Sequence, residues 1–168
     1  MAYQKLQVSR GIEVIPSDTI DIPNPSLDDV ASGAATATET TPNLDRLTNS
    51  GGLFESKGVA VGDVVYVLHA ATTNQITTVA SVDSETQLTL SDNVSFVSGD
   101  SYRIFRAGEN DGCILYIGNV PSGGVLRVLT AGGDDITLKG IVQGSYTPVQ
   151  VVRVFASDTN ATDIIALW

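Results

Sequence analysis

The chain is poor in the residues on which catalysis, redox chemistry and cross-linking most often depend. Its 168 residues include one cysteine, one histidine and one tryptophan. The lone Cys113 excludes an intramolecular disulfide and a cysteine-based zinc cluster, and we interpret it as a small buried apolar residue. The lone His69 lies in no sequence motif typical of a Ser/His/Asp or Cys/His catalytic site, so we interpret it as a structural or surface residue. We therefore expect that the protein is not an enzyme and assign no catalytic residue.

Basic residues and long apolar runs are scarce as well. Nine Lys and Arg stand against 19 Asp and Glu, which gives a formal net charge of -10, and the basic residues form no cluster. Such a surface repels phosphate backbones and anionic lipid headgroups, so we expect neither nucleic acid nor membrane as a partner. No apolar run approaches the roughly 18 residues of a transmembrane helix, and residues 1–5 do not resemble a signal peptide. Synthesis in a cytoplasm is expected.

Carboxylates are numerous, but their spacing does not define a site. Asp28-Asp29, Glu109 to Gly112 and Asp134-Asp135 have the oxygen ligands that Ca²⁺ prefers, yet none matches an EF-hand loop. Asp and Asn beside Gly are typical of turns, which is the reading we prefer. The glycine-rich segments 122–124 and 131–133 lack the residue order of a phosphate-binding loop. We assign no cofactor and no metal, and leave a bound Ca²⁺ open.

Residues 1–43 are predicted to form an extended N-terminal arm. Pro16, Pro23 and Pro25 fall within ten residues and prevent a regular helix or a central strand. Residues 31–41 are small and polar, too poor in large apolar groups to form a core of their own. A short strand is predicted at 6–8. We expect such an arm to be ordered only by packing on something else.

Residues 44–106 are predicted to form a β module. Period-2 alternation, in which every second residue is apolar, predicts half-buried strands at 75–82 and 87–90. Segment 64–68 is apolar on both sides, as in a central strand, and 101–105 completes the set. The module is expected to be a small barrel or curled sheet. One short helix is predicted at 41–47, because a threonine precedes a proline at its start and two glycines follow its end.

Residues 107–168 are predicted to form a second β module, a barrel or a sandwich. Expected strands cover 114–117, 125–129, 136–139, 149–155 and 164–167, and the glycine pairs at 123–124 and 132–133 favour tight turns between the first three. The last segment, Asp163 to Trp168, is apolar, and we expect it to be buried in a sheet or against another chain. The fold class is therefore all-β, with an extended N-terminal arm followed by two small antiparallel β modules and little helix; one two-layer sandwich is the alternative.

Several segments resemble small structural proteins of tailed bacteriophages. The likeness is carried by residues 147–155 and 161–168, by 128–140 and 14–20, and more generally by the virion-like β segments 59–66, 86–90 and 98–104. It touches most of the chain and includes no active site. The resemblance implies a virion component made in a bacterial host cytoplasm, namely a capsid cement or decoration protein on the outer face of the capsid.

The resemblance also implies partners: the major capsid protein and further copies of the chain, arranged as a homotrimer. A cement protein bridges shell subunits, which an extended proline-rich arm can do by lying along a partner. The contact residues predicted for the arm and the C-terminal edge are Ile15, Pro16, Ile20, Ile22, Pro23, Pro25, Ile164, Ile165, Leu167 and Trp168. Two alternatives remain: a neck, tail or fibre-base virion protein, and a module that binds host-surface glycan, which the single tryptophan disfavours.

Overall fold

The structure, a computed structural model, describes residues 8–25, 29–108 and 111–168, and they fall into two separate units. We call residues 8–25 with 111–168 the terminal unit and residues 29–108 the central unit. Every regular element in these ranges is a strand, and all strand pairs are antiparallel, which confirms the all-β prediction. One arm is expected over residues 1–43; of its described residues, 8–25 belong to the terminal unit and 29–43 to the central unit.

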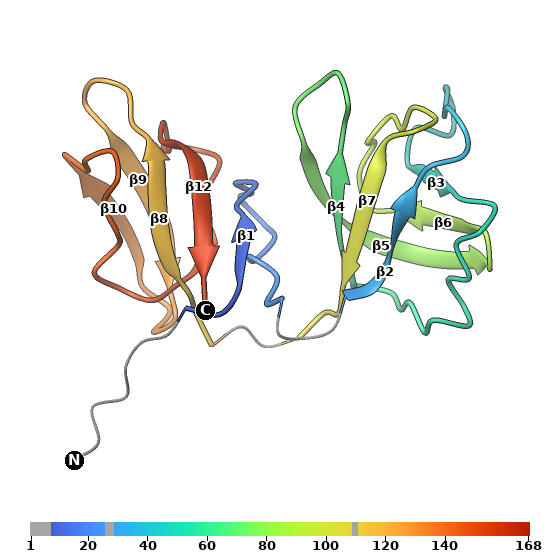
Figure 1. Cartoon of the computed structure of the whole chain (residues 1–168), viewed down its shortest axis with the longest axis horizontal. Coiled ribbons are helices and arrows are strands. Elements are labelled where there is room, and N and C mark those ends of the chain that lie inside the picture. Colours follow the sequence, from blue (N-terminus) through green and yellow to red (C-terminus); the bar gives the residue numbers. More distant parts are fainter. Residues whose placement is uncertain (1–7, 26–28, 109–110) are drawn as a thin grey trace, which may run out of the picture. The chain divides into compact units, whose positions relative to one another are not determined.

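The central unit is one curled six-stranded sheet (Figure 1). Its order is β2-β7-β4-β5-β6-β3. The long β5 pairs with β4 and β6, and its two register shifts let it bend between them. The strands are β2 (Asp29–Ala34), β3 (Arg46–Thr48), β4 (Val64–Leu68), β5 (Gln75–Ser84), β6 (Gln87–Leu90) and β7 (Ser101–Phe105).

The two edges of this curled sheet meet at one end. The amide of Thr36, just past β2, donates to the carbonyl of Thr48 at the end of β3, with 2.8 Å between N and O. The enclosed core is aromatic and aliphatic, with Phe54, Phe96 and Leu47 fully buried. The sheet is therefore barrel-like, as the alternation in 44–106 predicts.

The short helix predicted at 41–47 is wrong. Arg46 to Thr48 form β3, and Leu47 lies opposite Leu88 of β6 with none of its surface exposed. Burial of Leu47 in the barrel outweighs the local helix signals, because propensity is a weak term beside tertiary packing. Of the strand predicted at 6–8, Leu6 and Gln7 lie outside the described residues, and Val8 is exposed and in no strand.

The terminal unit consists of two three-stranded sheets, β1-β12-β8 and β10-β9-β11. In Figure 1, β12 (red) lies between β1 (blue) and β8 (gold). A bridge between Cys113 and Val151 joins the two sheets. The strands are β1 (Gly11–Glu13), β8 (Ile114–Asn119), β9 (Val125–Thr130), β10 (Asp135–Lys139), β11 (Val151–Val154) and β12 (Thr162–Leu167).

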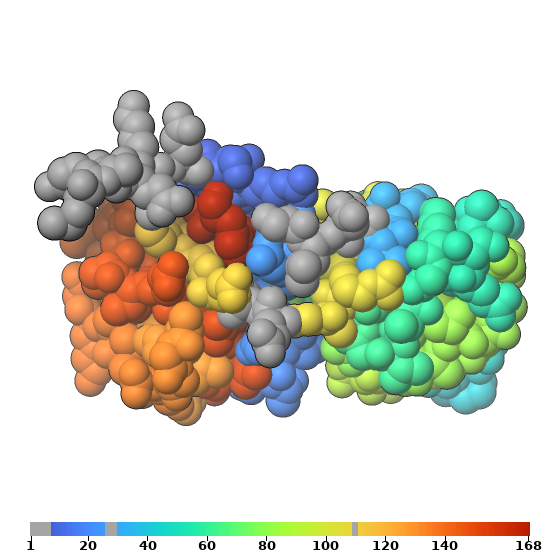
Figure 2. Space-filling model, turned by 90° about the horizontal axis from the view of Figure 1, so that it is seen from below, coloured from blue at the N-terminus to red at the C-terminus, as the bar shows by residue number. Residues whose placement is uncertain are grey.

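The N-terminal segment completes this unit. The amide of Val14 donates to Ile164, that of Ser17 to Val154 and that of Ile22 to Val152. In the space-filling view the blue atoms of this segment lie against the red atoms of the C-terminal strand (Figure 2). The segment thus contacts both sheets, and the apolar side chains of Ile12, Val14 and Ile22 join the core.

Gly118 of β8 lies close against the backbone of Asp163 in β12. A Cβ at this position would overlap the carbonyl oxygen of Asp163 and lie 2.8 Å from the Asp163 Cβ. Asp163 itself has a φ of 53°, in the left-handed region, which limits its freedom to move away.

We expect Gly118→Ala to destabilise the terminal unit by about 1–3 kcal/mol, because both backbones must shift to admit one methyl group. Gly132→Ala is the matched control, since the nearest atoms to its added Cβ lie 3.6 Å away. Urea unfolding, monitored by the fluorescence of Trp168, measures the stability of both variants. Equal unfolding midpoints for Gly118→Ala and Gly132→Ala would contradict the close approach of the two backbones.

Candidate functional site

The strand β12 is apolar on both of its faces. Ile164 and Ala166 point into the core of the terminal unit, where at most 1% of each is exposed. Ile165 and Leu167 point to the opposite side, where Ile165 is 38% exposed and Leu167 is half-buried. A strand with one solvated face alternates apolar and polar residues, and β12 does not. The second face of β12 therefore has the apolar composition of a surface that packs against other protein.

Residues of neighbouring strands extend this second face across the sheet. The register places Tyr116 of β8 opposite Ile165, and Ile114 opposite Leu167. Tyr146 lies beside Tyr116, with ring centroids 5.4 Å apart, and is 61% exposed. Directly paired residues share a face of the sheet, so these side chains form one patch. We call Ile114, Tyr116, Tyr146, Ile165 and Leu167 the outer apolar face.

The predicted contact residues do not gather on one surface. Only Ile165 and Leu167 belong to the outer apolar face. Ile22, Pro23, Pro25 and Ile164 are buried, and Ile15, Pro16, Ile20 and Trp168 are partly buried. The structure therefore buries three of the six predicted arm contacts within this chain. The Nε1 of Trp168 is buried and has no hydrogen-bond partner among the described residues.

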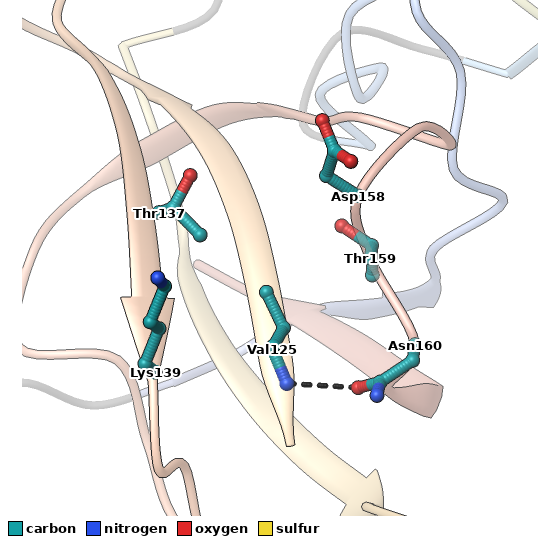
Figure 3. Close-up of a pocket in the computed structure, with 6 residues that line it drawn as sticks. All are labelled: Val125, Thr137, Lys139, Asp158, Thr159 and Asn160. Atoms are coloured by element: carbon teal, nitrogen blue, oxygen red, sulfur yellow. Dashed lines mark hydrogen bonds between the residues drawn. The ribbon is translucent and has the colours of Figure 1, made fainter. Parts of the chain in front are cut away.

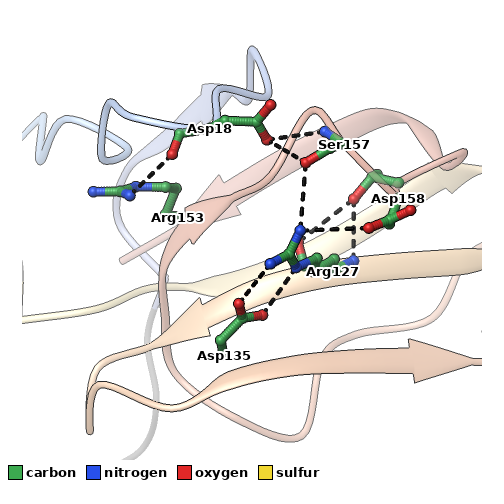
Figure 4. A network of polar contacts seen from close by, with 7 residues as sticks. Asp18, Arg127, Asp135, Arg153, Ser157 and Asp158 are labelled. Carbon is green, nitrogen blue, oxygen red and sulfur yellow. Dashed lines mark hydrogen bonds and ion pairs between the residues drawn. The ribbon is translucent and has the colours of Figure 1, made fainter.

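A network of charged side chains fastens the N-terminal segment to β9 and β11 (Figure 4). Arg153 of β11 lies 2.8 Å from the Asp21 carboxylate and also donates to the Asp18 carbonyl. Asp18 accepts hydrogen bonds from the amide and hydroxyl of Ser157, and these bonds lower the pKa of Asp18. Arg127 pairs with Asp135 at 2.7 Å and covers the Phe155 ring. We call these residues the arm clamp.

We expect Arg153→Ala to lower the free energy of unfolding of the terminal unit by about 1 kcal/mol, since it removes the Asp21 pair and packing on Phe155. Faster proteolysis between residues 15 and 25 should accompany the loss. Arg153→Lys keeps the charge without the planar fork and should show an intermediate effect. Unchanged cleavage in Arg153→Ala would contradict a fastening role of the arm clamp.

A surface pocket of about 500 Å³ lies beside the arm clamp (Figure 3). The Asn160 Oδ1 is occupied by the amide of Val125 at 2.8 Å, and the Thr159 Oγ1 by the amide of Arg127 at 3.0 Å. Its lining residues are Val125, Thr137, Lys139, Asp158, Thr159 and Asn160, and none is aromatic. The pocket offers hydrogen-bonding groups and one lysine, without a stacking surface for a sugar.

The contacts of His69 and Cys113 are those of structural residues. The His69 Nδ1 lies 2.7 Å from Asp100, and its Nε2 lies 3.1 Å from Gln75 rather than from a hydroxyl or thiol. This histidine–aspartate pair therefore lacks the nucleophile of a triad. Cys113 is buried and lies 3.2 Å from the carbonyl of Val151, and burial raises the pKa of its thiol to about 12. A thiol with that pKa is unreactive near neutral pH.

The carboxylates considered for Ca²⁺ are placed only in part. Asp28, Glu109 and Asn110 lie outside the described residues. Asp135 pairs with Arg127, while Asp134 is an exposed turn residue. Across residues 8–25, 29–108 and 111–168, no group of three or more His, Cys, Asp or Glu side chains is arranged to hold a metal ion. In the same ranges, no helix is long and apolar enough to cross a membrane.

Sequence reasoning missed Tyr116 and Tyr146 as surface residues. The aromatic residues lie mainly in strand-like patterns, which we interpret as core positions, and no local signal marks the pairing of residues 30 positions apart. Comparisons with protein-family models, with curated proteins and with solved structures find no match for the chain. The outer apolar face is thus the best-defined candidate for function.

Proposed function

We propose that the protein is a virion structural protein, and specifically a capsid cement or decoration protein that binds the outer face of the major capsid shell. The observation that carries this proposal is the outer apolar face, which suits burial against another protein. The resemblance of the sequence to structural proteins of tailed bacteriophages supplies the kind of assembly. In a shell, such a protein is repeated by symmetry, and a homotrimer fits a three-fold position.

The two-unit organisation supports a bridging role. Each unit has its own buried core, so each is able to contact a different neighbour. Bridging by two folded units replaces bridging by a free arm, because residues 9–25 are hydrogen-bonded and packed within the terminal unit. The net charge of -10 suits a protein on the outside of a DNA-filled shell, since it does not compete for the packaged DNA.

Copy number in purified particles tests the proposal. Quantitative mass spectrometry against the major shell protein should find the chain at hundreds of copies in each particle, as expected from icosahedral repetition. About 12 copies or fewer would instead favour a neck, tail or fibre-base position, where closed rings have few subunits. Absence from particles that package DNA normally would reject a virion role altogether.

A further inference from the structure

The sheet β1-β12-β8 has one open edge in the described part of the chain. At the β8 side, residues 144–147 cover the edge: Ile117 donates to Ser145, and Thr147 donates to Leu115. At the other side, β1 is the last strand of the sheet. An uncovered edge presents unpaired backbone groups that can bind another strand.

The exposed backbone groups of this edge belong to Gly11 and Glu13. The ladder between β1 and β12 extends from Arg10, which exchanges hydrogen bonds with Trp168, to Val14, which donates to Ile164. In an antiparallel ladder such bonds alternate, so Arg10, Ile12 and Val14 face β12. The N–H and C=O groups of the two residues between them therefore point away from β12, toward the open edge.

A surface pocket of about 380 Å³ lies beside this edge. It is lined by Gly11, Ile12, Glu13, Asp163 and Ile165. The absence of a side chain at Gly11 keeps the pocket open, since a Cβ there would lie 3.2 Å from Leu167 and 3.5 Å from Ile165. The pocket is thus continuous with the outer apolar face.

Two carboxylates define the charge that an occupant should have. Glu13 and Asp163 both line the pocket, and neither forms an ion pair or hydrogen bond through its side chain with another described residue. A second copy of this chain, with its net charge of -10, is a poor partner for this site. A basic occupant is complementary.

We propose that the edge of β1 accepts an extended segment of another protein as an added strand. Residues opposite Gly11 and Glu13 share the outer face of the sheet and are two positions apart in the incoming strand. The pocket beside Gly11 takes an apolar side chain, and Glu13 takes a lysine or arginine. The segment therefore has the pattern basic–any–apolar. This inference deepens the proposed virion function by giving the chemistry of the partner segment.

Titration of the full-length ¹⁵N-labelled protein with a synthetic peptide tests the inference. The probe is a capped peptide of about nine residues, a usual strand length. Every second residue is threonine, and the positions between the threonines are alternately valine and lysine. We expect the largest shifts and slowed hydrogen exchange at the amides of Gly11 and Glu13. Glu13→Gln should weaken binding by about two- to fivefold, as for an exposed charge pair. A peptide with glutamate in place of lysine should bind the unchanged protein more weakly than the lysine peptide binds Glu13→Gln.

An N-methylated version of the same peptide separates strand addition from simple charge attraction. It keeps the lysines and valines but is blocked at the amides that face β1, so its binding should be lost. Equal binding of both peptides, or shifts spread over the protein away from β1, would overturn the inference. So would a dimer of the protein alone with slow exchange at Gly11 and Glu13. A negative result here leaves the copy-number test of the virion role unaffected.

Discussion

Ile164→Asp is expected to unfold the terminal unit, whereas Ile165→Asp, one residue later, leaves it folded. Ile164 is 1% exposed and lies opposite Ile117, so an aspartate there would place a carboxylate in an apolar core. Such a burial, together with the lost apolar packing, costs about 4 kcal/mol or more. That loss is a large share of the stability of a small domain.

Ile165 faces outward, so an aspartate at this position stays solvated. We expect its effect on the free energy of unfolding to be below about 1 kcal/mol, as for other surface substitutions. If the proposed capsid-binding role is correct, binding to particles should nevertheless be lost, because the charge lies in the middle of the outer apolar face. Particles lacking the protein, mixed with the purified variant, should retain much less of it than of the unchanged protein.

The paired design makes the result interpretable. Trp168 is the only tryptophan and belongs to the terminal unit, so its fluorescence during urea unfolding reports on that unit. Hydrogen exchange of residues 29–108 shows whether the central unit remains folded. If Ile165→Asp binds particles as well as the unchanged protein does, the outer apolar face is not the binding surface.

The strands with a clear local pattern could be predicted from the sequence. The expected strand at 64–68 is β4, 75–82 lies within β5, and 87–90 and 101–105 are β6 and β7. All five strands expected between 114 and 167 are present as well. An alternating pattern or a short apolar run is sufficient here, because the side chains within each strand reflect how that strand is buried.

Elements that depend on distant partners were not predicted. The strand β2 contains small and polar residues, and it is ordered by pairing with β7, some 70 positions later. The segment from Gly11 to Val14 is likewise ordered by β12 at the far end of the sequence. No local pattern carries such information, because the stabilising hydrogen bonds connect residues that are far apart in the chain.

The candidate site could be predicted only in part. The apolar character of residues 164–168 predicts a segment that is buried in a sheet or against another chain, and that prediction needs no structure. Which residues complete the outer apolar face depends on register: Tyr116 joins it by pairing with Ile165, and Tyr146 by contact with Tyr116. The contact set predicted for the arm includes several side chains that the fold itself buries.

In the central unit, a large loss of folding stability is expected for Asp100→Ala. Asp100 is 4% exposed and accepts hydrogen bonds from the amides of Val97 and Ala70 and from His69. Removal of the carboxylate leaves these donors buried without a partner. Each unsatisfied donor costs about 1–3 kcal/mol, and partial rearrangement limits the total to about 3 kcal/mol.

The same carboxylate should make the stability of the central unit depend on pH. Burial alone would raise the pKa of Asp100, but the hydrogen bonds from Val97, His69 and Ala70 outweigh it, and the pKa lies below its usual value. A group with a lowered pKa stabilises the folded state above its unfolded pKa, about 3.9 for aspartate. That contribution is lost as the pH falls through the lower, folded pKa.

Unfolding of the unchanged protein and of Asp100→Asn should therefore diverge with pH. The unchanged protein loses stability of the central unit below about pH 4, while the asparagine variant starts less stable and loses less over the same interval. Hydrogen exchange of residues 29–108 between pH 3 and pH 6 measures both, with Asp83→Asn as a control at an exposed carboxylate. Parallel pH profiles for all three proteins would show that Asp100 is not the group that stabilises the turn at residues 97–100.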